Sequence, residues 1–98
     1  MSVLQDCYQI VAGSGQSIAS ASTETTQAGF AVGKVYIITV NTDSYFRFSG
    51  SAVAATDGNF DIFLPAGSSA ILRCTHATAR VIQDSADGIC GISEIAIV

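Results

Sequence analysis

The chain has 98 residues, of which 49% are hydrophobic and only 12% are charged, and its formal net charge is −4. The length predicts a single domain over residues 1–98. Four basic residues in total are too few for the Lys and Arg cluster of a nucleic-acid-binding protein, and they also disfavour binding to an anionic membrane. No apolar run approaches the roughly 20 residues that span a bilayer, and the N-terminus lacks the features of a secretion signal. We expect a protein that is made in a cytoplasm and stays soluble.

The three cysteines, Cys7, Cys74 and Cys90, are far apart and form no Cys-x-x-Cys pair. Their odd number leaves at least one thiol free, and a reducing compartment would leave all three free. Each lies in an apolar run, where a cysteine behaves as a small buried hydrophobic residue.

The first predicted strand covers residues 3–12, with Leu4, Tyr8, Ile10 and Ala12 on the face that we assign to the core. Residues 13–29 follow, a small and polar stretch whose composition predicts a flexible Ser/Thr-rich loop or arm. Within it, residues 17–20 alternate as a short edge strand would. Two interpretations stay open, an ordinary exposed loop and an arm that orders only against a neighbouring subunit.

Residues 35–40 are apolar on both faces, which is typical of a central strand covered on both sides. After the turn at residues 41–43, the next strand separates its faces. Phe46 and Phe48 are expected inside, with Tyr45 and Arg47 outside.

Asp57-Gly58 is the strongest hairpin signal, because type I′ turns need positive φ at both central positions. In the strand that follows, Phe60, Ile62 and Leu64 are assigned to the core face. Residues 64–67 then match a type I turn, with proline second and glycine fourth.

Further strands are predicted over residues 69–75, 78–83 and 89–97. The total is seven or eight short strands with regular turn signals and no convincing helix. The predicted fold class is therefore all-β: a single antiparallel β-sandwich, jelly-roll-like.

Residues with catalytic or metal-binding chemistry form no convincing set. Asp57, Asn59 and Asp61 have the opening spacing of a calcium loop, but the later glycine and glutamate of that loop are missing. His76 is the only histidine, so neither a zinc site nor a catalytic triad can be assembled around it, and we assign it to a loop. We expect no enzyme activity, no metal and no cofactor.

A family resemblance extends from about residue 35 to residue 95. The residues that carry it are Ala54-Ala55-Thr56-Asp57, Leu64-Pro65-Ala66-Gly67, Ala79-Arg80-Val81-Ile82 and a final strand with Glu94. This pattern resembles the small β-sandwich virion proteins of tailed bacteriophages, of the capsid decoration or cement type. The resemblance implies a virion structural protein, made in the host cytoplasm, that binds the major capsid protein or another virion protein. It also implies a homo-oligomer, often a trimer, and carries no site residues over.

Five residues that lie opposite the core parity of their strands are our interface candidates: Tyr45, Arg47, Phe63, Ile71 and Arg73. The alternative is that they cover a second face within one subunit. A structural role at the head–tail junction or in the tail fits the same features. A carbohydrate-binding β-sandwich module is the alternative from another class, although tryptophan is absent and the three tyrosines are scattered.

Overall fold

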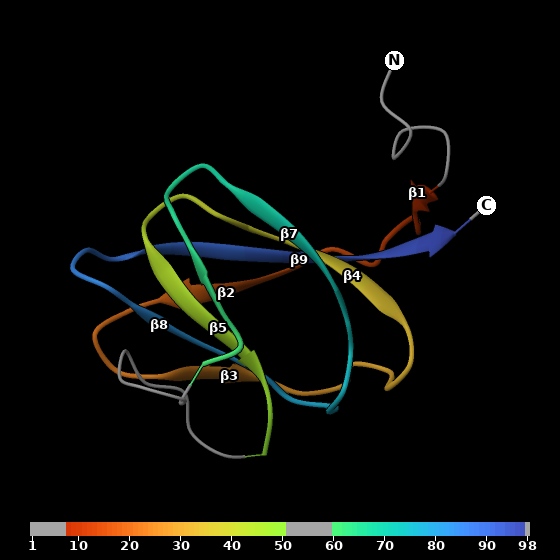
Figure 1. Ribbon diagram of the computed structural model, residues 1–98, viewed down its shortest axis with the longest axis horizontal. Coiled ribbons are helices and arrows are strands. Elements are labelled where there is room, and N and C mark those ends of the chain that lie inside the picture. The colour runs from red at the N-terminus through yellow and green to blue at the C-terminus, as the bar shows by residue number, and fades with distance from the viewer. Residues whose placement is uncertain (1–7, 51–59, 98) are drawn as a thin grey trace.

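The computed structural model describes residues 8–50 and 60–97, and this part of the chain is all-β (Figure 1). It contains nine strands and no helix: β1 Tyr8–Ile10, β2 Gln16–Ser20, β3 Thr25–Gln27, β4 Val35–Val40, β5 Ser44–Phe48, β6 Ile62–Leu64, β7 Ser69–Arg73, β8 Ala79–Gln83 and β9 Gly88–Ile97. Each strand is short and bounded by turn or loop residues, as the sequence pattern predicts. The expected all-β class is confirmed.

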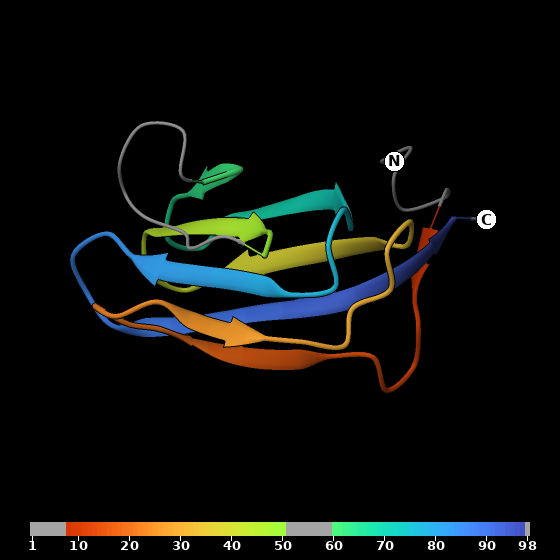
Figure 2. The ribbon, with the colours of Figure 1, turned by 90° about the horizontal axis from the view of Figure 1, so that it is seen from below.

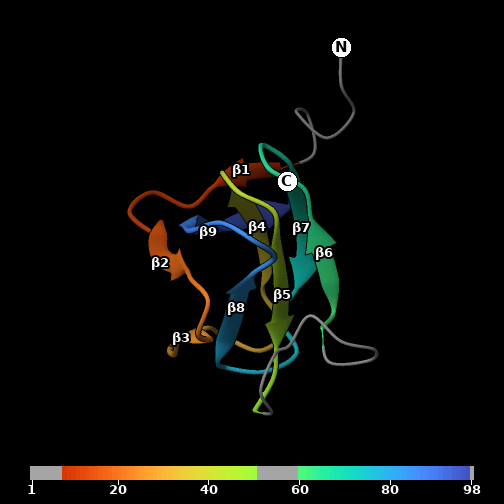
Figure 3. The same ribbon diagram turned by 90° about the vertical axis from the view of Figure 1, so that its left-hand side faces the viewer.

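The strands form two antiparallel sheets that face each other (Figure 3). In the first sheet β4 lies between β7 and β9, and the far edge of β9 pairs with β2 and, nearer its end, with β1. The second sheet has the order β3-β8-β5-β6. Strands of both sheets run roughly along the long axis of the molecule (Figure 2). The turns that connect the two sheets therefore lie at the two ends of this axis.

The pairing between strands is nested. β2 pairs with β9, β3 with β8, β4 with β7 and β5 with β6, and successive pairs alternate between the two sheets. The chain thus folds back on itself once, between β5 and β6, and the resulting long double strand wraps around the core. β1 lies outside this nesting.

The core is a single cluster between the sheets, built from the inward parity of each strand. Phe46 is fully buried and Phe48 is 4% exposed, which confirms their predicted inward orientation. The Phe46 and Phe48 rings meet edge to face with centroids 5.0 Å apart, and the Phe48 ring also contacts the rings of Phe30 and Tyr36. Such aromatic contacts add to the burial of apolar area that drives folding.

The short edge strand expected at residues 17–20 is present as β2. Residues 13–29 also contain β3, so this stretch is not the loop or arm that its composition predicts. Ile18 and Ser20 point into the core, and the Ser20 hydroxyl is 2.6 Å from the buried hydroxyl of Ser44. Polar side chains on the outward parity do not prevent the backbone from pairing with β8 and β9, and sequence composition did not reveal this. β3 is the strand that the sequence did not predict, and it brings the count in the described part of the chain to nine rather than seven or eight.

The predicted core face of the first strand is wrong where it can be checked. Ile10 is 50% exposed and Ala12 is exposed as well, while Leu4 lies outside the described residues. β1 pairs with residues 95–97 of β9, and only the first of these three also pairs with β4. The strand therefore lies at the end of the sheet, where few neighbours can cover its side chains.

Two further details of the sequence prediction are corrected. β4 is central, but its outward side chains Val35 and Ile37 are only half-buried, so it is not covered on both sides.

The turn after β6 is shifted by one residue: the Ser68 N–H donates to the Pro65 carbonyl at 3.0 Å, and Gly67 has φ +80°. Positive φ at the third position is the signature of a type II turn, which requires glycine there. The predicted hairpin at residues 57–58 lies outside the described residues.

Gly88 begins β9 against the turn after β4, and we expect Gly88→Ala to destabilise the protein by about 1–3 kcal/mol, a typical cost of overpacking. An added Cβ would overlap the side-chain oxygens of Thr42 and Asn41. The Asn41 oxygen cannot move away freely, because it accepts a 2.7 Å hydrogen bond from the Ile89 N–H. Urea denaturation of the variant and the wild type measures the loss.

Gly15→Ala is the matched control for this substitution. Its added Cβ would lie 3.5 Å from Ser93 Oγ, which is an ordinary contact, so the stability should change little. Equal stability of the two variants would contradict the predicted close approach at Gly88.

Candidate protein-binding surface

The outer face of the second sheet carries a cluster of large apolar side chains, which we call the aromatic face: Tyr45, Phe60, Phe63 and Ile82. Tyr45 of β5 lies directly between Phe63 of β6 and Ile82 of β8 in the strand register. The Tyr45 ring centroid is 5.0 Å from that of Phe63 and 4.8 Å from that of Phe60. Phe63 is 38% exposed and the other three are half-buried. The aromatic face exists because β5 places Phe46 and Phe48 inward and the alternate residues outward.

Polar contacts fix the position of Tyr45 at the rim of the aromatic face. Its hydroxyl donates a 3.2 Å hydrogen bond to Asp84 Oδ1. Desolvation raises the pKa of Tyr45 above its usual value, and the hydrogen bond to Asp84 and the charges of Asp84 and Asp43 raise it further. The hydroxyl therefore stays a neutral donor at physiological pH, and the ring is held in one orientation.

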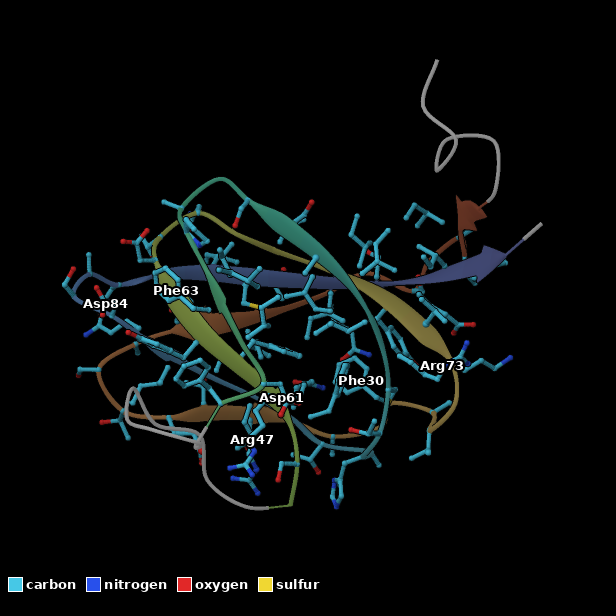
Figure 4. All side chains as sticks on the ribbon, in the orientation of Figure 1. Phe30, Arg47, Asp61, Phe63, Arg73 and Asp84 are labelled. Carbon is cyan, nitrogen blue, oxygen red and sulfur yellow. The ribbon has the colours of Figure 1, made fainter. Side chains whose placement is uncertain are left out.

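Arg47 and Arg80 lie opposite each other on β5 and β8, on the same outer face. Like charges in this position repel, and each guanidinium has its own carboxylate. Arg47 Nε is 4.0 Å from an oxygen of Asp61, and Arg80 Nη1 is 2.7 Å from Glu24 Oε1. Arg80 also donates to the carbonyls of Ser49 and Gly50, at 2.7 and 3.1 Å. Both arginines are therefore held beside the aromatic face (Figure 4 labels Arg47, Asp61 and Phe63).

The five predicted interface residues do not form one surface. Tyr45, Arg47 and Phe63 gather on the outer face of the second sheet, as described above. Ile71 and Arg73 belong to β7, on the outer face of the first sheet, where Ile71 lies beside Ile37 of β4. Ile71 is half-buried and Arg73 is exposed.

Sequence reasoning missed two members of the aromatic face. Ile82 could have been found, because it alternates with Ala79 and Val81, which are fully buried. Phe60 was assigned to the core with Ile62 and Leu64, but its ring packs on Tyr45 instead. β6 begins only at Ile62, so strand alternation does not extend back to residue 60.

Cys74, Cys90 and His76 are the thiol and imidazole side chains in the described part of the chain. Cys74 and Cys90 are free and buried, as predicted, while Cys7 lies outside the described residues. His76 lies in the loop between β7 and β8, as predicted, and its Nδ1 accepts a 3.3 Å hydrogen bond from the Thr78 N–H. Within residues 8–50 and 60–97, no group of three His, Cys, Asp or Glu side chains is placed to hold a metal ion. Asp57 and Asn59 of the calcium-like spacing are outside this part.

The described part of the chain contains no pocket and no helix long and apolar enough to cross a membrane. Comparison of the chain with protein-family models, with curated proteins and with solved structures finds no match in any of the three.

Proposed function

We propose that this protein is a structural component of a bacteriophage virion that decorates or cements the capsid, with the aromatic face as its docking surface. Its partner would be the major capsid protein or another virion protein, and the protein would be made in the host cytoplasm and reside in the virion. The observation that carries the proposal is the outward-facing cluster of Tyr45, Phe60 and Phe63, in which Phe63 is exposed and the other two rings are half-buried. The described part of the chain has no pocket. A flat surface of this kind suits protein contact better than the enclosure of a small molecule.

The strand pairing supports a jelly-roll fold for this protein. In a jelly roll, a long double strand wraps into two four-stranded sheets, an arrangement used by viral capsid domains and by lectins. The nested pairs from β2–β9 to β5–β6, alternating between two sheets, match this arrangement. The fold alone does not assign a function, so the weight of the proposal rests on the surface.

The chemistry of the aromatic face is that of a protein-binding hot spot. Aromatic residues and arginine are enriched at the centres of protein interfaces, where they bury large areas at a low entropy cost. Tyr45 is oriented by Asp84, and Arg47 lies near Asp61. Side chains that are already ordered lose little freedom on binding. The surface therefore fits a partner that binds and stays, as a decoration protein does.

The double substitution Tyr45→Ala with Phe63→Ala tests the proposed surface. Loss of a hot-spot residue costs about 2 kcal/mol or more, which corresponds to a roughly thirtyfold weaker affinity. We expect the wild type to co-sediment with capsids of the phage that encodes it, and the variant to be lost from the pellet at matched concentrations. Ile10→Ala is the control, since Ile10 is also exposed, at 50%, but belongs to β1 of the first sheet and to neither proposed contact.

The outcomes separate the proposal from its alternatives. Wild-type protein that binds tails or head–tail junctions but not capsids would favour the second virion role. Binding on a glycan array, abolished by the same two substitutions, would favour a carbohydrate-binding module. Capsid binding that survives the double substitution would show that the aromatic face is not the docking surface.

A further inference from the structure

The charged residues divide into two sets. Arg47 with Asp61 and Arg80 with Glu24 form ion pairs on the second sheet. The other described charged residues, which make no ion pair within the described part of the chain, are Lys34, Asp43, Arg73, Asp84, Asp87 and Glu94. Asp43, Asp84 and Arg73 make hydrogen bonds to neutral groups, namely the Ala66 N–H, the Tyr45 hydroxyl and the Gly33 carbonyl. Each of the six therefore keeps a net charge that no ion pair with another described residue neutralises.

These remaining charges are separated along the 36 Å long axis of the molecule. Lys34 precedes β4 and Arg73 ends β7; because the two strands are antiparallel, both residues lie at the same end. We call this the basic end, and its one described acidic residue is Glu94, which pairs with Tyr36 in the register.

At the opposite end, which we call the acidic end, are Asp43, after β4, and Asp84 and Asp87, between β8 and β9. Arg73 and Asp84 are labelled at opposite ends in Figure 4.

Each end also presents an exposed aliphatic side chain next to its charges. Val32 is 65% exposed in the loop before Lys34, and Ile89 is 50% exposed just after Asp87. Together with Ile10 and Phe63, they are the large hydrophobic residues that the described part of the chain exposes. An exposed apolar residue beside unpaired charges is the composition of a small docking patch.

Both patches are held rigidly by hydrogen bonds. In the basic end, the Gly33 N–H donates to the Cys74 carbonyl at 2.9 Å, and Arg73 Nη1 donates to the Gly33 carbonyl at 2.6 Å. In the acidic end, the Ile89 N–H donates to Asn41 Oδ1 at 2.7 Å. Surfaces that are ordered before contact pay less entropy on association.

We propose that the basic end of one copy docks on the acidic end of a second copy of this chain. Lys34 and Arg73 would face Asp84 and Asp87 of the second copy, with Val32 packed near the second copy's Ile89. Two different patches that meet in this way form a heterologous interface, which closes into a ring if the rotation between copies permits it. The inference deepens the proposed function, since it names the contacts of the proposed oligomer. It rests on self-association and not on capsid binding.

Charge complementarity between the two ends favours a second copy of this chain as the binding partner. Within the described part of the chain, the basic end has two cations and one carboxylate, and the acidic end has three carboxylates, none of them in an ion pair. The two ends therefore have opposite net charge and attract each other, whereas two like ends repel. Exposed ion pairs are individually weak, so the charges set the orientation and the encounter rate, while the aliphatic contact excludes water. Such an interface should weaken in salt, because charges are screened within about 3 Å at 1 M ionic strength.

Charge reversal at the two ends tests the inference. Lys34→Glu with Arg73→Glu makes both ends acidic, and Asp84→Lys with Asp87→Lys makes both ends basic. Sedimentation velocity across a dilution series should show the wild type associating at low salt and each reversed variant dissociating at a concentration at least about tenfold higher. The chain with all four substitutions should associate again, because the attraction is restored with its sign inverted. Thermal melting confirms that each variant is folded.

Several results would overturn the inference. These are a wild type that is monomeric throughout the series, reversed variants that associate as well as the wild type, and a folded fourfold variant that stays dissociated. If a reversed variant does not fold, the milder pair Arg73→Gln and Asp87→Asn replaces it, each with a smaller expected weakening. Capsid binding is scored separately with Phe63→Ala, which keeps the Tyr45–Asp84 hydrogen bond and should leave self-association unchanged. Failure of this inference is therefore distinguishable from failure of the proposed function.

Discussion

Phe46→Ala is expected to lower the free energy of unfolding by about 3–5 kcal/mol, the largest effect of any single substitution considered for this protein. Phe46 is fully buried at the centre of β5, and its ring meets Phe48 edge to face at 5.0 Å. Removing the ring takes away its transfer free energy and leaves a cavity that a sheet on each side cannot readily collapse to fill. Urea denaturation measures the loss.

Phe63→Ala is the matched control, because it removes the same ring from the neighbouring strand. Phe63 is 38% exposed on the outer face of the same sheet, so its loss should cost no more than about 1 kcal/mol. A smaller cost for Phe46→Ala than for Phe63→Ala would mean that the assignment of the two faces of this sheet is inverted.

The second large effect concerns alkaline pH. Burial raises the pKa of the Cys90 thiol to about 12, from a usual value of 9.0. Above pH 9 the unfolded chain releases this proton and the folded chain does not, so the free energy of unfolding falls as pH rises. Stability is fully present below pH 9 and is lost by about 1.4 kcal/mol per pH unit up to about pH 12. At pH 11 the expected loss from this thiol is about 2–3 kcal/mol.

The comparison with Cys90→Ala isolates this contribution. Other groups that ionise in the alkaline range, including Tyr45 and Cys74, whose pKa values are also raised by desolvation, are present in both proteins and cancel in the difference. Between pH 9 and pH 11 the wild type should lose about 2–3 kcal/mol more than the variant. Parallel stability curves over this range would show that the thiol titrates freely in the folded protein.

The two proposals assign different parts of the surface to different partners. The aromatic face on the second sheet would contact the shell, and the two charged ends would contact neighbouring copies. Because the sheet strands run along the axis that joins the ends, a ring formed through the ends would leave the outer face of the second sheet free. The two surfaces would then meet only at Asp84, which accepts the Tyr45 hydroxyl and also belongs to the acidic end.

The alternation of apolar and polar residues determined the all-β class and the orientation of β5. In β5 the inward side chains of Phe46 and Phe48 alternate with the outward side chains of Tyr45 and Arg47, which is a period of two residues. One face of such a strand must be buried for the chain to fold, so the alternation fixes which face that is. The same alternation on β8 predicts that Ala79 and Val81 point inward and that Ile82 points outward. Burial of cysteine followed equally directly, because Cys74 and Cys90 lie in apolar runs of the sequence.

Only the tertiary structure decided what depends on contacts between distant residues. Residues 17–20 alternate as an edge strand would, but β3 has a loop-like composition. It is a strand because the edge of β8 offers unpaired backbone groups to it, as the edge of β9 does to β2. The five interface candidates divide between two faces because β5 and β7 belong to different sheets, and sequence parity gives only the side of a strand. The separation of Lys34 and Arg73 from Asp84 and Asp87 likewise follows from antiparallel pairing, since local sequence specifies no strand order.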